Sequence, residues 1–238
     1  MSNTSIGLAQ KGSKLAIQRL SLPQNSPLLN NILCDKLEWI SPKEADDYKE
    51  YRMNSPVLLN MLGVTKELKD KYFKLFWPSP QPEWDGIAKG ENNKLYLFEA
   101  KSHFSEIVPS KEKNPVSDRM KYESIMSTAS RLFNIEDTPI NRKIWCNDYY
   151  QISNRITFQQ RLLDISKSNN INYDDVIMVF LNFINDRTWE KEKLMVCSGK
   201  DWDDYYDNHI LPKMGLTREL LFHNGILLIN LNIDSFLQ

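Results

Sequence analysis

The chain has 238 residues, of which 41% are apolar and 26% are charged, so it can bury a sizeable core and is not intrinsically disordered. Thirty Lys and Arg residues against 31 Asp and Glu residues give a net charge of -1, which excludes a protein that coats nucleic acid through a broad basic surface. No apolar run reaches the roughly 18 residues of a membrane span, and residues 1–14 are polar. We therefore expect no membrane span, no signal peptide and a cytoplasmic location. The three Cys residues are widely spaced, which predicts reduced thiols.

The first part of the chain is predicted to form an arm followed by two helices. Residues 1–35 show no sustained periodicity, which indicates an arm that packs on a body formed by residues 36–238. Ser41 can cap a helix and the Pro that follows suits the first helical position, so we expect a helix over residues 41–53. A second helix is expected over residues 57–76, with an interruption at a Gly and an end at a run of alternating prolines.

Two strands joined by a short loop are predicted over residues 84–101, where apolar stretches flank a polar break. With a three-residue loop, Gly90 pairs with Lys94, and the same register places Asp85 directly opposite Glu99. A two-residue turn would shift the register by one and weaken that pairing. Both faces of the second strand are apolar until charges appear near its end, which is typical of a strand covered on two sides.

Helical and buried extended segments alternate in the rest of the chain. Their periodicity predicts helices over residues 114–133, 148–167 and 201–214. Nearly continuous apolar runs predict a central buried strand over residues 176–183 and a last strand over residues 226–233. The expected fold class is therefore α/β, with a central mixed sheet flanked by helices.

The charged residues at the end of the predicted hairpin form the main candidate site. A period of two places Glu99 and Lys101 on one face of the strand, with Ala100 pointing away. If Asp85 lies opposite Glu99, the two Cβ atoms are about 5 Å apart. Two carboxylates at that distance repel each other unless a proton or a cation joins them, and Mg²⁺ takes one or two carboxylates together with water. The pattern indicates a site for a hard metal ion.

The hairpin resembles the PD-(D/E)XK nuclease superfamily, whose signature is an Asp followed by Glu-x-Lys on the adjacent strand. Here the first motif reads Pro82-Glu83-Trp84-Asp85 and the second reads Glu99-Ala100-Lys101. The resemblance covers residues 84–101 directly, and the element order over residues 41–183 is compatible with the superfamily core. A wider pattern, which includes Trp84-Asp85-Gly86 and Tyr149-Tyr150-Gln151-x-x-Asn154-Arg155, looks like a bacterial family within the superfamily and implies no particular substrate.

The resemblance implies a restriction-endonuclease-like core in a single domain over residues 36–238 and a Mg²⁺- or Mn²⁺-dependent nuclease. Asp85 and Glu99 would ligate the metal together with the Ala100 carbonyl. Lys101 would orient or activate the attacking water and offset charge on the phosphate. The substrate would be nucleic acid, DNA more than RNA.

The motif is also compatible with two roles that involve no cleavage. In the first, Glu99 and Lys101 form an ordinary surface ion pair. In the second, the chain keeps the nuclease fold as a non-catalytic nucleic-acid-binding or scaffold module. Because the net charge is close to zero, a homodimer or a protein partner is a further expected source of affinity.

Five further residues are candidates for a supporting role. Glu50 is the preferred extra carboxylate before the hairpin, although a solvated helix position accounts for it as well. His103 would continue the Glu99 face if the strand persists, where it could donate to phosphate or serve the structure alone. Gln151, Asn154 and Arg155 share one helix face and could hold phosphate or position a carboxylate, or simply solvate the start of the helix.

Overall fold

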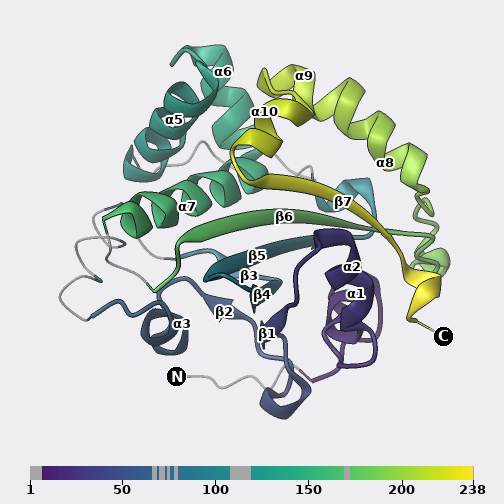
Figure 1. Cartoon of the computed structure of the whole chain (residues 1–238). Helices are drawn as coiled ribbons and strands as arrows, with labels where there is room; N and C mark the ends of the chain where they lie inside the picture. The colour runs from purple at the N-terminus through teal and green to yellow at the C-terminus, as the bar shows by residue number, and fades with distance from the viewer. Residues whose placement is uncertain are drawn as a thin grey trace.

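A five-stranded mixed sheet forms the centre of the protein in the computed structural model (Figure 1). The structure describes residues 7–65, 69, 73, 76–77, 80–107, 119–168 and 172–237. The strand order is β1-β4-β5-β6-β7, in which the β1–β4 and β4–β5 pairs are antiparallel and the β5–β6 and β6–β7 pairs are parallel. These strands are β1 (Glu38–Ser41), β4 (Gly86–Lys89), β5 (Lys94–Lys101), β6 (Asp175–Ile184) and β7 (Ile226–Asn232). A small second sheet pairs β2 (Tyr51–Arg52) with β3 (Glu83–Trp84).

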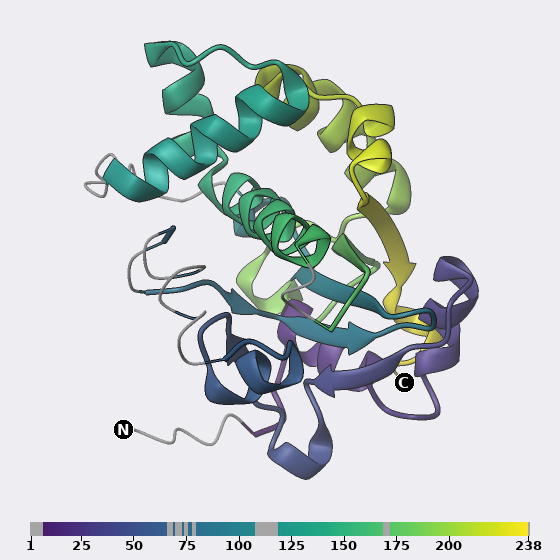
Figure 2. The ribbon, with the colours of Figure 1, turned by 60° about the vertical axis from the view of Figure 1, so that its left-hand side comes forward.

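Helices cover both faces of the central sheet, as Figures 1 and 2 show from two directions. One core contains Leu95 and Leu97 of β5 and packs against the helices of the later part of the chain. These helices are α5 (Arg119–Phe133), α6 (Pro139–Lys143), α7 (Tyr150–Lys167), α8 (Gly199–Tyr205), α9 (Leu211–Met214) and α10 (Arg218–His223). The other core contains Tyr96 and Phe98 and packs against α1 (Gly12–Leu20) and α2 (Ser26–Leu33). The expected α/β class, with a mixed sheet between helices, is confirmed.

The β4–β5 hairpin has the predicted three-residue loop. Gly90 N donates to Lys94 O at 2.8 Å, and Lys89 pairs with Leu95. Asn92 and Asn93 adopt left-handed backbone conformations with φ of 55° and 57°, which Asn tolerates better than most residues. The register that follows from this loop is the one predicted from the sequence.

Asp35, which follows α2 in the chain, holds the hairpin loop in place through its carboxylate. Its carboxylate accepts from Glu91 N at 2.8 Å and from the Tyr96 hydroxyl at 2.7 Å, and it pairs with Lys94 at 3.4 Å. A Cβ at Gly90 would lie 2.6 Å from this carboxylate, so the missing side chain makes room for it. The segment after α2 therefore holds the turn that sets the register.

The helix expected over residues 41–53 is wrong. Residues 38–41 are extended because Trp39 pairs with Ala88 of β4 and packs on Phe98 with the ring centroids 5.0 Å apart. After them the chain makes only a 3-10 turn, since Asp47 and the next residue have φ of 54° and cannot continue a helix. The cap signal at Ser41 is misleading: this hydroxyl donates to the Lys49 carbonyl at 3.0 Å and closes the loop.

Later helix predictions are confirmed where the structure describes them. The second expected helix is present as α3 (Pro56–Met61) and stops at Gly63, whose φ is +73°, whereas much of residues 66–79 lies outside the described residues. The start of the helix expected at residue 114 also lies outside them, and α5 covers the rest. Residues 1–35 were expected to form an arm that packs on the body; their described part contains α1 and α2, which pack on the sheet. Among the described helices, none has the length and apolar character needed to cross a membrane.

Candidate functional site

Asp85 lies at the bend where the chain passes from β3 into β4. Gly86 pairs with Phe98, so one step back along the same register Asp85 faces Glu99. The Ala100 N–H donates to Asp85 Oδ2 at 2.8 Å. Since the N–H and the C=O of one residue in an extended strand point to the same side, the Ala100 carbonyl also faces Asp85. Asp85 and the Ala100 backbone, two of the predicted donors, are thus in contact through this hydrogen bond.

Glu99 is the centre of a buried network of cations and amides. Its side chain is only 2% exposed, and its carboxylate accepts from Lys101 Nζ, Gln151 Nε2 and Arg155 Nε. The last two come from the first turns of α7, which crosses this face of the sheet (Figure 2). Arg155 also donates to the Glu83 carbonyl at 2.8 Å, which ties α7 to β3. Glu99 and Lys101 are therefore not a solvent-exposed ion pair.

The charges of this network determine which groups are ionised. Burial alone would raise the pKa of Glu99, but the Arg155 and Lys101 charges hold it below its usual value. Burial would lower the pKa of Lys101, but the Glu99 and Asp85 charges hold it above its usual value. Burial and the Glu99 charge together raise the pKa of Asp85 to about 7. The network thus favours the charged forms of Glu99 and Lys101, and it favours the protonated form of Asp85 more than in an ordinary Asp.

Glu50 is the third carboxylate in this part of the protein. Glu50 directly precedes Tyr51, which pairs with Trp84, the residue before Asp85. Its side chain is 15% exposed, and its Oε1 lies 3.0 Å from Lys14 Nζ of α1. The sequence placed Glu50 on a helix, whereas it precedes β2 in a loop. Nothing in the sequence indicated Lys14, which lies in the arm and carries no motif.

Two of the predicted supporting residues do not reach Glu99. Asn154 instead accepts from Arg155 Nη1 at 3.2 Å and donates to the Tyr150 hydroxyl at 3.4 Å. His103 does not continue the strand face, since β5 ends at Lys101. Its ring contacts Ser105 Oγ at 2.7 Å and Glu106 Oε1 at 3.1 Å, which gives it local structural partners.

The donor set suits Mg²⁺ or Mn²⁺ in kind and in number. Among the described residues, no three His, Cys, Asp or Glu side chains converge on one point that a metal ion could occupy. The set is thus the Asp85 and Glu99 carboxylates with the Ala100 carbonyl, and Mg²⁺ commonly completes so small a set with water. A metal ion on Glu99 competes with Lys101, because the Lys101 ammonium already lies on Glu99 Oε1.

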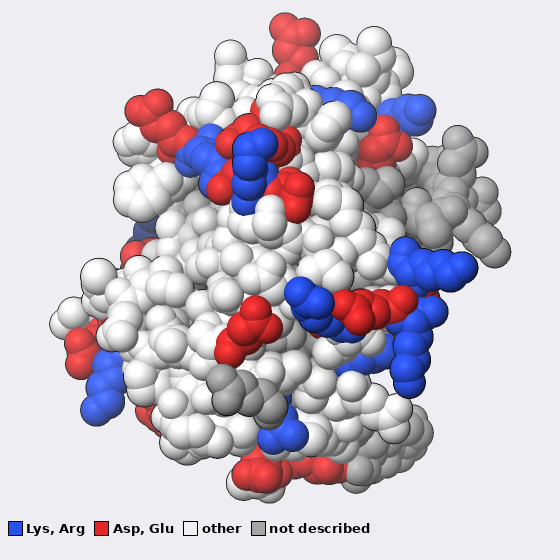
Figure 3. All heavy atoms as spheres, turned by 90° about the vertical axis from the view of Figure 1, so that its right-hand side faces the viewer, with Lys and Arg blue, Asp and Glu red and all other residues white. Residues whose placement is uncertain are grey.

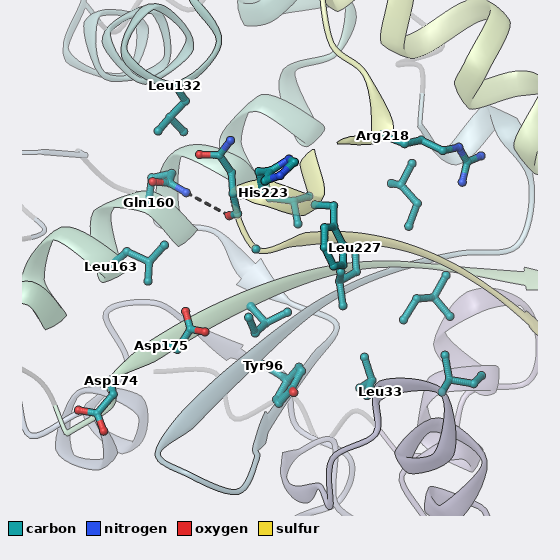
Figure 4. Close-up of a pocket in the computed structure, with 18 of the residues that line it drawn as sticks. Leu33, Tyr96, Leu132, Gln160, Leu163, Asp174, Asp175, Arg218, His223 and Leu227 are labelled. Atoms are coloured by element: carbon teal, nitrogen blue, oxygen red, sulfur yellow. Dashed lines mark hydrogen bonds between the residues drawn. The ribbon is translucent and has the colours of Figure 1, made fainter. Parts of the chain in front are cut away.

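The cavity shown in Figure 4 lies away from these residues. It has a volume of 890 Å³, runs along β7 between α2 and α10, and is lined mainly by apolar side chains such as Leu33, Leu163 and Leu227. None of the candidate site residues lines it. On the face shown in Figure 3, Lys and Arg side chains intermingle with Asp and Glu around a wide uncharged centre, with no single basic patch.

Comparisons with protein-family models, with curated proteins and with solved structures gave no match.

Proposed function

We propose that this protein is a divalent-metal-dependent nuclease that hydrolyses phosphodiester bonds of nucleic acid, with DNA as the first expected substrate. The observation that supports this best is the place of the Asp85 carboxylate, which accepts from Ala100 N and lies within electrostatic range of Glu99, with Lys101 held against Glu99 by an ion pair. The resemblance of Asp85 and Glu99-Ala100-Lys101 to the PD-(D/E)XK superfamily implies the same reaction and a restriction-endonuclease-like core. The five-stranded mixed sheet is compatible with that core.

The balance of charge in the site also favours an anionic substrate. Asp85 and Glu99 face the cations Lys101 and Arg155, so the group is neutral when both carboxylates are ionised. A bound divalent cation would leave this group with an excess positive charge. The negative charge of a phosphodiester would offset that excess. Without metal, the same group has no such excess once both carboxylates are ionised.

Asp85, Glu99 and the Ala100 carbonyl would hold the Mg²⁺ or Mn²⁺ ion. The ion would supply Lewis acidity and lower the pKa of a bound water. Gln151 and Arg155 fix the Glu99 carboxylate by donating to it. Lys101 donates to Glu99 Oε1; if that oxygen were to hold the ion, the Lys101 ammonium would turn to the phosphate or to the attacking water.

The first prediction tests this proposal by cleavage of single- and double-stranded DNA and RNA. Cutting should require Mg²⁺ or Mn²⁺ and stop in chelator. Asp85→Asn and Lys101→Met should each reduce the rate by at least about a hundredfold, because each removes a group that acts on the metal or on the phosphate. Lys200→Met is the matched control, since it removes the same charge from a side chain that is 85% exposed. Cutting that persists unchanged in Asp85→Asn would contradict the proposal.

A non-catalytic binding module is the second candidate function. It is favoured by the Glu99 carboxylate, which is already held by Lys101, Gln151 and Arg155 without a metal ion. If this candidate is correct, the chain binds nucleic acid in chelator and in Mg²⁺ with equal affinity and cuts none of the substrates.

A further inference from the structure

Helix α1 brings a lysine to Glu50, the carboxylate that precedes β2. Lys14 Nζ lies 3.0 Å from Glu50 Oε1, and the Lys14 side chain is 40% exposed. Glu50 in turn directly precedes Tyr51, which pairs with Trp84, the residue before Asp85. Burial raises the pKa of Glu50, and the charges of Glu83 and Glu99 raise it further. Lys14 therefore pairs with a carboxylate that is within electrostatic reach of the Glu99 network.

The backbone around Lys14 is held by contacts of the residues that precede and follow it in the chain. Gly12 N donates to Thr188 Oγ1 at 2.8 Å, and Ser13 Oγ donates to Glu106 Oε2 at 2.8 Å. Further along α1, Ile17 packs on β4, where a Cβ at Gly86 would come within 2.8 Å of it. Gly86 directly follows Asp85, so the helix is seated on the strand that carries the site. Lys14 is thus held near the site by the fold and not by the Glu50 contact alone.

We propose that Lys14 contacts a phosphate of the bound nucleic acid and that Glu50 holds its ammonium at the site when no substrate is present. The inference rests on the proposed function and adds a substrate-binding residue from the N-terminal helix. A partly exposed ion pair contributes little to stability, so exchange of Glu50 for a phosphate oxygen as the partner of Lys14 is easily reversed. The phosphate accepts a charge-assisted hydrogen bond from Nζ, and no covalent bond changes.

The test is the salt dependence of binding to a fluorescent DNA duplex, measured with Ca²⁺ and again in chelator. Lys14→Ala should weaken binding roughly tenfold and should lower the magnitude of the slope of log K against log[salt] by about 0.9, the contribution of one phosphate contact. Lys49→Ala is the matched control, because Lys49 is 42% exposed and pairs with Asp46 instead of a site carboxylate. The control should keep the wild-type slope. A merely structural Lys14 would change the melting temperature without changing the slope.

A second variant pair isolates the Glu50 contact. Glu50→Gln should strengthen binding in chelator, because it removes one negative charge and releases Lys14. The gain should shrink severalfold in the double variant with Lys14→Ala. If wild type binds the duplex but Lys14→Ala keeps its affinity and its slope, the inference is wrong and the proposed function stands. If wild type binds no nucleic acid under either condition, the proposed function itself is wrong.

Discussion

Asp85 is the residue whose protonation links the site to the stability of the fold. Its carboxylate faces Glu99 and accepts one backbone hydrogen bond from Ala100. Burial and the charge of Glu99 raise its pKa from 3.8 to about 7, so the folded chain keeps a proton that the unfolded chain releases. The stabilising contribution of this proton is complete below about pH 4 and is lost as the pH rises to about 7.

The metal-free protein should therefore become less stable between pH 5 and pH 8 through Asp85. The difference between 3.8 and about 7 corresponds to at most about 4 kcal/mol in the free energy of unfolding. Asp85→Asn carries no such proton, so its stability should change less over the same interval. Urea unfolding of both proteins in chelator measures the effect. Parallel stability curves would show that Asp85 titrates at its ordinary pKa.

The β4–β5 hairpin is the element that aligns the site. A change in its loop would be the most direct way to shift the pairing register of the two strands. A shift of one residue would move Asp85 away from Glu99 and reverse the faces of the strand. Asp35 opposes this shift, because it binds Glu91 N, the Tyr96 hydroxyl and Lys94 together. Burial would raise the pKa of Asp35, but these hydrogen bonds and the Lys94 charge lower it. Its stabilisation is thus present above its usual pKa and is lost as the pH falls below it.

Asp35→Ala should lower the free energy of unfolding by about 2 to 4 kcal/mol at pH 7, because it leaves the buried Tyr96 hydroxyl and the Glu91 N–H without their acceptor. Asp174→Ala is the control, because Asp174 contacts the same loop from the segment before β6. Its carboxylate accepts from Asn93 in an exposed position, so its loss should cost less than about 1 kcal/mol. Chemical denaturation measures both. Equal losses in the two variants would argue against Asp35 as the anchor of the loop.

The hairpin could be predicted because its turn depends on residues that are neighbours in the sequence. The segment before it could not, because its conformation depends on residues that are distant in the sequence. The loop register follows from neighbouring residues, since Gly90, Asn92 and Asn93 suit a tight turn by themselves. The helix expected from Ser41 fails because a distant strand pairs with Trp39 and because Asp47 turns left-handed, neither of which is a local signal. The site shows the same contrast. The spacing of Gln151 and Arg155 in the sequence already places them on one helix face, whereas only tertiary packing brings Lys14 to Glu50.

At the scale of the whole molecule, a net charge of -1 limits how the protein can hold nucleic acid. The face in Figure 3 shows mixed charges instead of a basic patch, and several cations are already paired with carboxylates, as Arg218 is with Asp203 and Asp207. Affinity should then come from few phosphate contacts or from a second copy or a protein partner.

The slope of log K against log[salt] for duplex DNA should accordingly correspond to about two to four phosphate contacts, on the scale where each contributes about -0.9. Asp85→Asn should strengthen binding in chelator, since it removes a negative charge from the site. Fluorescence titration across a range of salt concentrations measures both quantities. A steep slope typical of roughly six to ten contacts would show that a basic surface elsewhere dominates binding.

The parallel half of the sheet also determines when during synthesis the site can form. Ribosomes release the chain from its N-terminus, and β5, with Glu99 and Lys101, emerges well before the α7 residues that hold Glu99. The second neighbour of β5 starts only at Asp175, and that strand is itself bordered by β7. A nascent chain that stops before Asp175 leaves one edge of β5 bare and Lys101 without its neighbour Asn182. Prematurely terminated products of this kind would carry the whole motif in an incomplete sheet, so we expect no cleavage from a chain that lacks β6.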